Sequence, residues 1–195
     1  MTSPCRVPGY AGAMQAMHWA TVALLIGAYV AVWSIKDGAS DATTAGLAML
    51  HRSFGLTILG LTAFRFAWRQ RTPVPQLPAD VPRLQRIAAR ASVAALYVLL
   101  GLQPVLGVVG SLLYGDHVTV FGAVVLPSLL PFNRPLARQT FWLHGWTALL
   151  LLALISMHVA AALYHHFVRR DAVLSGMLPG VRPLPARDRL AQAPR

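Results

Sequence analysis

The sequence predicts an all-α protein, an integral membrane four-helix bundle whose two termini both lie in the cytoplasm. Three observations support this fold: the composition, the number of long apolar runs, and the distribution of positive charge. Of the 195 residues, 56% are hydrophobic and only 12% are charged. That composition is too apolar for an ordinary soluble domain and is typical of a membrane protein.

Four apolar runs are long enough to be membrane-spanning helices. Each exceeds the roughly 20 residues that a helix needs to cross a bilayer core of about 30 Å. Pro104 and Gly107 fall inside the third run and are expected to bend that helix, which a membrane bundle tolerates. The runs extend approximately from Met14 to Lys36, from Gly46 to Arg69, from Leu84 to Tyr114, and from Leu136 to Arg169.

The three connections between the runs are polar or rich in proline, and they lie within a single domain. Asp37 to Ala45 joins the first two helices, and Thr72 to Pro82 joins the second to the third. Gly115 to Pro135 contains several apolar residues, so we expect it to lie on the membrane surface or to cap the bundle. Residues 10–178 form the transmembrane domain, and residues 179–195 form a cytoplasmic tail rich in Pro and Arg. This tail is predicted to be disordered and attracted to anionic lipid.

Positive charge is distributed unequally between the two sides of the predicted bundle. With the N-terminus inside, thirteen of the seventeen Lys and Arg residues fall on the inner side, and only Lys36, Arg134 and Arg138 fall outside. This asymmetry predicts cytoplasmic termini. The formal net charge of +11 does not indicate nucleic-acid binding, because the basic residues flank the apolar runs and form no separate patch.

Apart from His165 and His166 at the end of the fourth run, four of the seven histidines fall within the apolar runs: His18, His51, His144 and His158. Ionisable residues inside a membrane are costly and usually mark a functional site. His144 and His158 are 14 residues apart on one helix. They therefore lie about 40° apart around the helix axis and about 21 Å apart along it.

The depths of these histidines predict two pairs. His18 and His158 lie toward the inner side, whereas His51 and His144 lie toward the outer side. Each pair would hold one non-covalent haem b by both axial positions, which suits electron transfer and not oxygen binding. Arg52 and Arg65 are candidate partners for the haem propionates.

Other roles for the histidines are open at this point. A single intramembrane histidine is as often a hydrogen bond between helices as a ligand, and four could form a proton relay, a metal site or a proton-coupled transport path. A transition-metal site would normally need carboxylates or thiolates nearby, which the apolar runs lack. His165 and His166 near the inner interface would be interfacial anchors or, more specifically, contacts for a quinone headgroup.

An ordered set of residues resembles the bacterial cytochrome b561 family of four-helix di-haem membrane cytochromes, which are related to hydrogenase cytochrome b subunits. The resemblance covers roughly Tyr10 to Leu178. Its motifs are Tyr10 eight residues before His18-Trp19; H-x3-G-x9-R-x3-R from His51 to Arg69; Tyr97, Pro104 and Gly107; and Trp142-x-His144 followed by His158 and His165-His166.

The resemblance implies haem b iron ligands at His18, His51, His144 and His158, and exchange with ubiquinone or another quinone, with His165 as a candidate contact. Some family members are superoxide oxidases, which take an electron from periplasmic superoxide and pass it to ubiquinone. We therefore expect a multi-pass oxidoreductase of the bacterial inner membrane that links a periplasmic one-electron partner to the quinone pool. The alternative function is that of a haem-bearing membrane anchor for a soluble dehydrogenase or hydrogenase.

Overall fold

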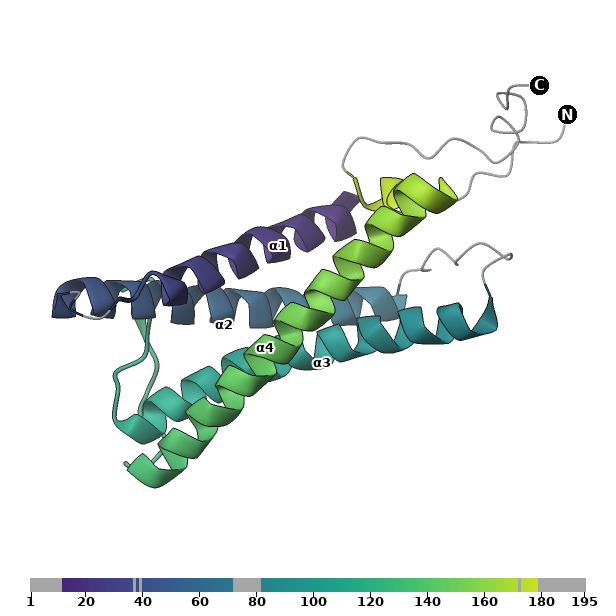
Figure 1. Cartoon of the computed structure of the whole chain (residues 1–195). Helices are drawn as coiled ribbons and strands as arrows, with labels where there is room; N and C mark the ends of the chain where they lie inside the picture. The colour runs from purple at the N-terminus through teal and green to yellow at the C-terminus, as the bar shows by residue number, and fades with distance from the viewer. Residues whose placement is uncertain (1–11, 37, 39, 72–81, 172, 179–195) are drawn as a thin grey trace, which may run out of the picture.

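A computed structural model describes residues 12–36, 38, 40–71, 82–171 and 173–178. Its four long helices are α1 (Gly12–Trp33), α2 (Asp41–Arg71), α3 (Arg83–Tyr114) and α4 (Arg134–Tyr164) (Figure 1). All four are long and apolar enough to cross a membrane. The predicted four-helix membrane fold is confirmed. Tyr10 and the tail 179–195 lie outside the described residues.

Helix α2 begins at Asp41, five residues before the apolar run that predicted it. Ser40 explains the earlier start, because its Oγ accepts a hydrogen bond from the backbone N–H of Thr43 at 3.2 Å. This contact satisfies a free donor of the first turn, and Asp41 complements the positive end of the helix dipole. The connection between α1 and α2 is correspondingly shorter than expected.

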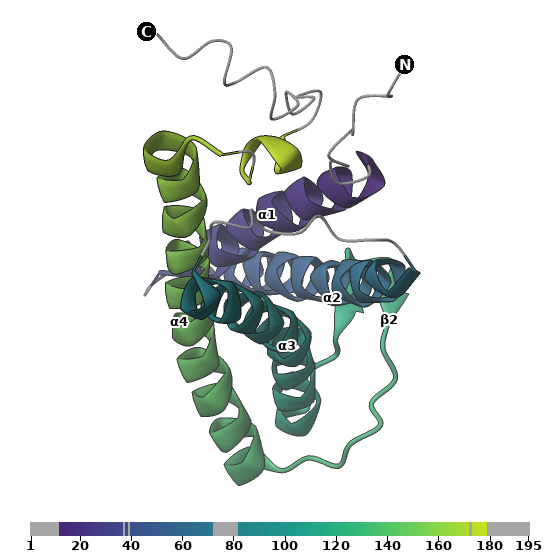
Figure 2. The same ribbon diagram turned by 90° about the vertical axis from the view of Figure 1, so that its right-hand side faces the viewer.

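Helix α3 continues through Pro104 to Tyr114 and is stopped by the next residue, Gly115, whose φ is 90°. Figure 2 shows α3 changing direction along its length, as expected of a helix with an internal proline. Pro104 is buried within the bundle.

The connection from α3 to α4 contains a small antiparallel hairpin, which the sequence did not predict. Strand β1 (Thr119–Val120) pairs with β2 (Val124–Val125), and the turn places Phe121 at φ 49° and Gly122 at φ 70°. The backbone N–H of Phe121 donates to Ser53 Oγ at 2.7 Å, and the Phe121 ring lies edge-on to Phe54. The hairpin therefore covers the adjacent part of α2.

Helix α4 is followed by a π-helical turn (His165–Arg169) and a short 3-10 helix (Ser175–Met177) that folds back to α1. Gln15 Nε2 donates to Gly176 O at 2.9 Å, and Trp19 Nε1 donates to Met177 O at 2.8 Å. The start of α1 and the last described residues thus lie at one end of the bundle, here called the terminus end. The opposite end is called the hairpin end, because the connection that carries β1 and β2 lies there; Figure 1 shows this connection at the left and the segment after α4 at the upper right.

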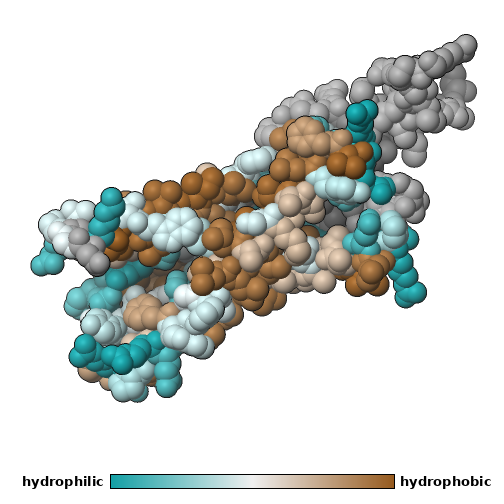
Figure 3. All heavy atoms as spheres, in the orientation of Figure 1, coloured by the Kyte–Doolittle hydropathy of each residue, from teal (hydrophilic) through white to brown (hydrophobic). Residues whose placement is uncertain are grey.

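Glycines allow the helices to approach closely at two interfaces. A Cβ on Gly27 of α1 would lie 2.9 Å from the Phe54 ring of α2, and a Cβ on Gly110 of α3 would lie 2.9 Å from the Phe141 ring of α4. Small residues at such crossings are typical of membrane helix pairs. On the face shown in Figure 3, hydrophobic residues cover the middle of the helices and hydrophilic residues gather toward the ends.

Candidate functional site

The centre of the bundle is an apolar cluster that separates two pairs of histidines. Ile58, Leu99, Leu100 and Leu151 are buried there, and further leucines of α1, α3 and α4 pack around them. Leu151 lies midway in sequence between His144 and His158. One histidine pair therefore lies toward each end of the bundle, with hydrocarbon side chains between them.

The terminus-end pair consists of His18 from α1 and His158 from α4. Their ring centres are 6.5 Å apart, with an angle of 60° between the planes. Trp19 lies edge-on to His18 and, through its bond to Met177 O, ties this part of α1 to the segment after α4.

Arg65 of α2 is a cation close enough to this pair to interact electrostatically with both His18 and His158. Its guanidinium lies over the Tyr97 ring, 5.8 Å from the ring centre. Its Nε is buried and has no hydrogen-bond partner among the described residues. A buried donor without a partner is costly, so this position is suited to an anionic group of a bound ligand.

The hairpin-end pair consists of His51 from α2 and His144 from α4. Their ring centres are 6.1 Å apart, with an angle of 80° between the planes. His51 Nδ1 lies 2.8 Å from Ala28 O, and His144 Nδ1 lies 3.1 Å from Gln103 O. A carbonyl oxygen can only accept, so each Nδ1 carries the hydrogen and each Nε2 keeps a free lone pair. Both imidazoles are thus in the tautomer that can bind a metal through Nε2.

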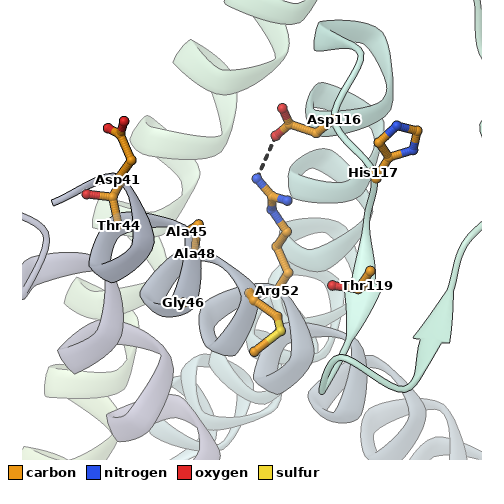
Figure 4. A pocket seen from close by; sticks show the side chains of 10 residues that line it. Asp41, Thr44, Ala45, Gly46, Ala48, Arg52, Asp116, His117 and Thr119 are labelled. Atoms are coloured by element: carbon orange, nitrogen blue, oxygen red, sulfur yellow. Dashed lines mark hydrogen bonds and ion pairs between the residues drawn. The ribbon is translucent and has the colours of Figure 1, made fainter.

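Arg52, next to His51 in sequence, is already paired with a carboxylate. Its NH2 group lies 2.6 Å from Asp116 Oδ2, and both side chains are partly exposed. Figure 4 shows this ion pair in an open pocket between α2 and the hairpin connection, with the His117 ring pointing away from it. The ion pair leaves Arg52 less available for a propionate than Arg65 is.

His165 lies at the terminus end and is held by an acidic residue. Its Nδ1 is 2.5 Å from Asp171 Oδ2, and both side chains are largely buried. Arg169 lies 3.6 Å from the same carboxylate oxygen. His165 begins the π-helical turn, and such turns are frequent at functional sites. His166, in contrast, is exposed.

The model of the family "Prokaryotic cytochrome b561" matches residues 9–180. The chain belongs to this family. It is 32% identical over 165 residues to cytochrome b561 homolog 2 of Escherichia coli K12, which covers 84% of this chain and 87% of the relative. It is also 28% identical over 167 residues to a probable superoxide oxidase of Yersinia pestis, covering 85% of this chain and 93% of that protein.

Membership makes this chain a b-type membrane cytochrome that acts in electron transfer. The histidine pairs fit a b-type haem. Metal–imidazole bonds are about 2 Å long, so two imidazoles on one iron place their ring centres about 6 Å apart. The separations of 6.1 and 6.5 Å are close to that value. These are the same two pairs that the position of each histidine along its helix predicted from the sequence. Their role as axial ligands stays a prediction.

Three polar residues near the hairpin-end pair contribute to this site, although the sequence did not predict it. Asp116 neutralises Arg52, and Gln103 and Thr147 join α3 to α4 beside His144. Gln103 could have been noticed as the one amide side chain in the middle of the third apolar run. Its partners could not, because they depend on how α3 is rotated against α4.

Proposed function

We propose that the protein binds two b haems and passes electrons across the bacterial inner membrane, between a one-electron partner on the outer side and the quinone pool. The observation that carries this proposal is the presence of two histidine pairs, with ring centres 6.1 and 6.5 Å apart, toward opposite ends of a membrane-spanning bundle. The inner membrane fits a bacterial multi-pass protein of this family.

The residues of the chain would hold the haems and keep water away from them. When bound, the haems supply reversible one-electron reduction. The two histidines of each pair would hold one haem iron, which suits electron transfer and not oxygen binding. Arg65 would donate to a propionate at the terminus end, where its buried Nε has no partner among the described residues. The leucines between the pairs exclude water from the centre of the bundle.

The distribution of basic residues supports one orientation of the bundle in the membrane. We propose that the terminus end faces the cytoplasm, because most of the described Lys and Arg residues lie on that side. The hairpin end, with the Arg52–Asp116 pocket, would then face the outside. Superoxide is the outer donor that we propose, because a relative that matches most of this chain is a probable superoxide oxidase.

His165 is the proposed contact for the quinone headgroup at the terminus end. With Nδ1 donating to Asp171, its Nε2 is left to exchange a proton with a quinone carbonyl. Two superoxide anions would be oxidised to two molecules of oxygen. The two electrons and two protons from solution would reduce one quinone to quinol.

The test uses purified protein in liposomes that contain a ubiquinone. Superoxide is generated outside by xanthine oxidase, and the haem spectrum and quinol formation are followed, with superoxide dismutase as the control. We expect haem reduction and quinol formation that dismutase abolishes. If the haems respond to quinol but not to superoxide, the partner on the outer side is a molecule other than superoxide. Haems that respond to neither would overturn the proposal in favour of an anchor subunit that needs its soluble enzyme.

A further inference from the structure

We propose that Gln103 is the positioning residue of the hairpin-end haem site, because it fixes both the ring of His144 and the segment of α4 that carries it. This inference rests on the proposed di-haem function and adds a residue that tunes one of the two haems. Gln103 is 9% exposed and lies on α3, whereas His144 and Thr147 lie on α4.

Three hydrogen bonds join Gln103 to one turn of α4. Its backbone carbonyl accepts from His144 Nδ1 at 3.1 Å. Its side-chain Nε2 donates to His144 O at 3.1 Å, and its Oε1 accepts from Thr147 Oγ1 at 2.5 Å. The backbone of Gln103 therefore holds the ring of His144, and its side chain holds the backbone that carries this ring.

The orientation of the amide follows from its partners. The carbonyl oxygen of His144 can only accept, so the NH2 group of Gln103 must face it. The Oε1 atom then faces Thr147, and two oxygens at 2.5 Å require the hydroxyl hydrogen between them. Thr147 Oγ1 also lies 2.7 Å from Leu143 O, so breaking the bond to Gln103 would let the hydroxyl turn back to its own helix.

The neighbouring Gly107 and the full pairing of the amide both support the contact between α3 and His144. A Cβ on Gly107, one turn later, would lie 3.3 Å from His144 Cε1, so glycine allows the ring to approach α3. A buried amide inside a membrane helix is costly unless both of its ends are paired. Both ends of Gln103 are paired, and both pair with the turn that carries His144.

A consequence for the haem follows from the bond to Nδ1. A hydrogen bond from Nδ1 raises the basicity of the other ring nitrogen and fixes the plane of the ring. A more basic ligand stabilises the oxidised iron and lowers its reduction potential. Loosening the contact between Gln103 and α4 should therefore raise the midpoint potential of the hairpin-end haem. His51, on the other side of that site, is held by the backbone of Ala28 and should be unaffected.

The experiment compares four variants of the full-length protein in detergent: Gln103→Leu, Thr147→Val, Thr147→Ser and Thr140→Val. Thr140 is the matched control, because its hydroxyl donates within its own helix, to Leu136 O at 2.9 Å. Redox titration gives the midpoint potential of each haem, and the electron paramagnetic resonance spectrum of the oxidised protein reports the orientation of the axial ligands.

We expect Gln103→Leu and Thr147→Val to raise the potential of one haem and to shift its resonance signal, while the second haem keeps both values. Thr147→Ser keeps the hydroxyl that donates to Gln103 and should therefore show the wild-type values. Thr140→Val should also leave both values unchanged. Two haems with unaltered potentials and signals in Gln103→Leu would overturn the role of Gln103 while leaving the di-haem function intact. A wild-type protein that lacks haem would instead overturn the proposed function itself.

Discussion

The two histidine pairs differ in how the charged and polar groups around them are partnered. At the hairpin end, His51 and His144 each donate to a backbone carbonyl, and the nearby Arg52 is neutralised by Asp116. At the terminus end, Arg65 acts on both His18 and His158 and keeps a buried Nε without a partner among the described residues. Among the described residues, the protein thus pairs Arg52 with a carboxylate at the hairpin end, whereas the buried Nε of Arg65 at the terminus end is left to bind a ligand.

This difference indicates which site should hold an electron more strongly. A positive charge without a carboxylate partner favours the reduced, less positive form of an iron centre nearby. We therefore expect the terminus-end haem to have the higher reduction potential. Electrons that enter at the hairpin end would then flow toward the terminus end, where His165 and Asp171 lie.

The largest expected effect comes from replacing a single histidine of either pair. His144→Leu should remove about one of two haems per chain, because an iron with one remaining imidazole loses much of its binding energy. His158→Leu should remove the other haem, with a different spectrum for the one that stays. The pyridine haemochrome assay measures the content, and an unaltered haem content in both variants would contradict the ligand assignment.

Gly27→Ala should perturb the hairpin end selectively. The new Cβ would lie 2.9 Å from the Phe54 ring, next to Ala28, whose carbonyl holds His51. Overpacking of this kind typically costs about 1–3 kcal/mol. Thermal unfolding in detergent, followed separately at the two haems, should show the loss first at the hairpin-end haem. Gly60→Ala is the control, because no described residue lies within 4 Å of its Cβ position; equal losses in both variants would contradict this prediction.

Arg65→Leu should lower the potential of the terminus-end haem. Removing its charge should shift this potential downward by roughly 50 mV, which corresponds to about a tenfold change in a one-electron equilibrium. Arg69→Leu is a matched control, because Arg69 also lies over the Tyr97 ring, 5.9 Å from its centre. Redox titration provides the measurement. A shift at the hairpin-end haem, or an equal shift in both variants, would show that the two ends do not differ as described.

Asp116→Asn should have the smallest effect. Its ion pair with Arg52 is partly exposed, with side-chain exposures of 23% and 33%, so its loss should cost no more than about 1 kcal/mol of stability. Release of Arg52 should also raise the potential of the hairpin-end haem slightly. Asp41→Asn, in the same pocket, serves as the control. A loss of stability well above that of the control would mean that the hairpin connection depends on this ion pair more than its exposure suggests.

The sequence was sufficient to predict the four helices, because long apolar runs in this composition have few alternatives. Depth along the helices predicted the groups His18 with His158 and His51 with His144, and the ring centres of these pairs lie 6.5 and 6.1 Å apart; their binding of haem stays a prediction. The start of α2 was misplaced because Ser40 begins the helix outside the apolar run. The hairpin was missed because Phe121, a bulky residue, occupies a turn position with φ 49° that usually takes Gly or Asn.

The contacts around the histidines could not be predicted for a different reason. Arg52 and Asp116 are 64 residues apart, and Gln103 and His144 are 41 residues apart. Their contacts depend on the rotation of each helix about its axis and on the path of the hairpin connection. Neither is encoded in hydrophobic periodicity, because a helix that is apolar toward both the lipid and the bundle interior shows little amphipathic pattern. The sequence suggested both Arg52 and Arg65 as partners for the haem propionates. The structure distinguishes them, because Arg52 is paired with Asp116 and the buried Nε of Arg65 has no partner among the described residues.

The most direct test of the central claim, that two separate sites each use one histidine pair, is the haem content of double variants. A same-pair variant, His51→Leu with His144→Leu, should lose about one haem per chain, as either single variant does. A cross-pair variant, His18→Leu with His51→Leu, should lose both, in protein that remains monodisperse on size-exclusion chromatography. Loss of both haems from the same-pair variant, or retention of one in the cross-pair variant, would contradict the account.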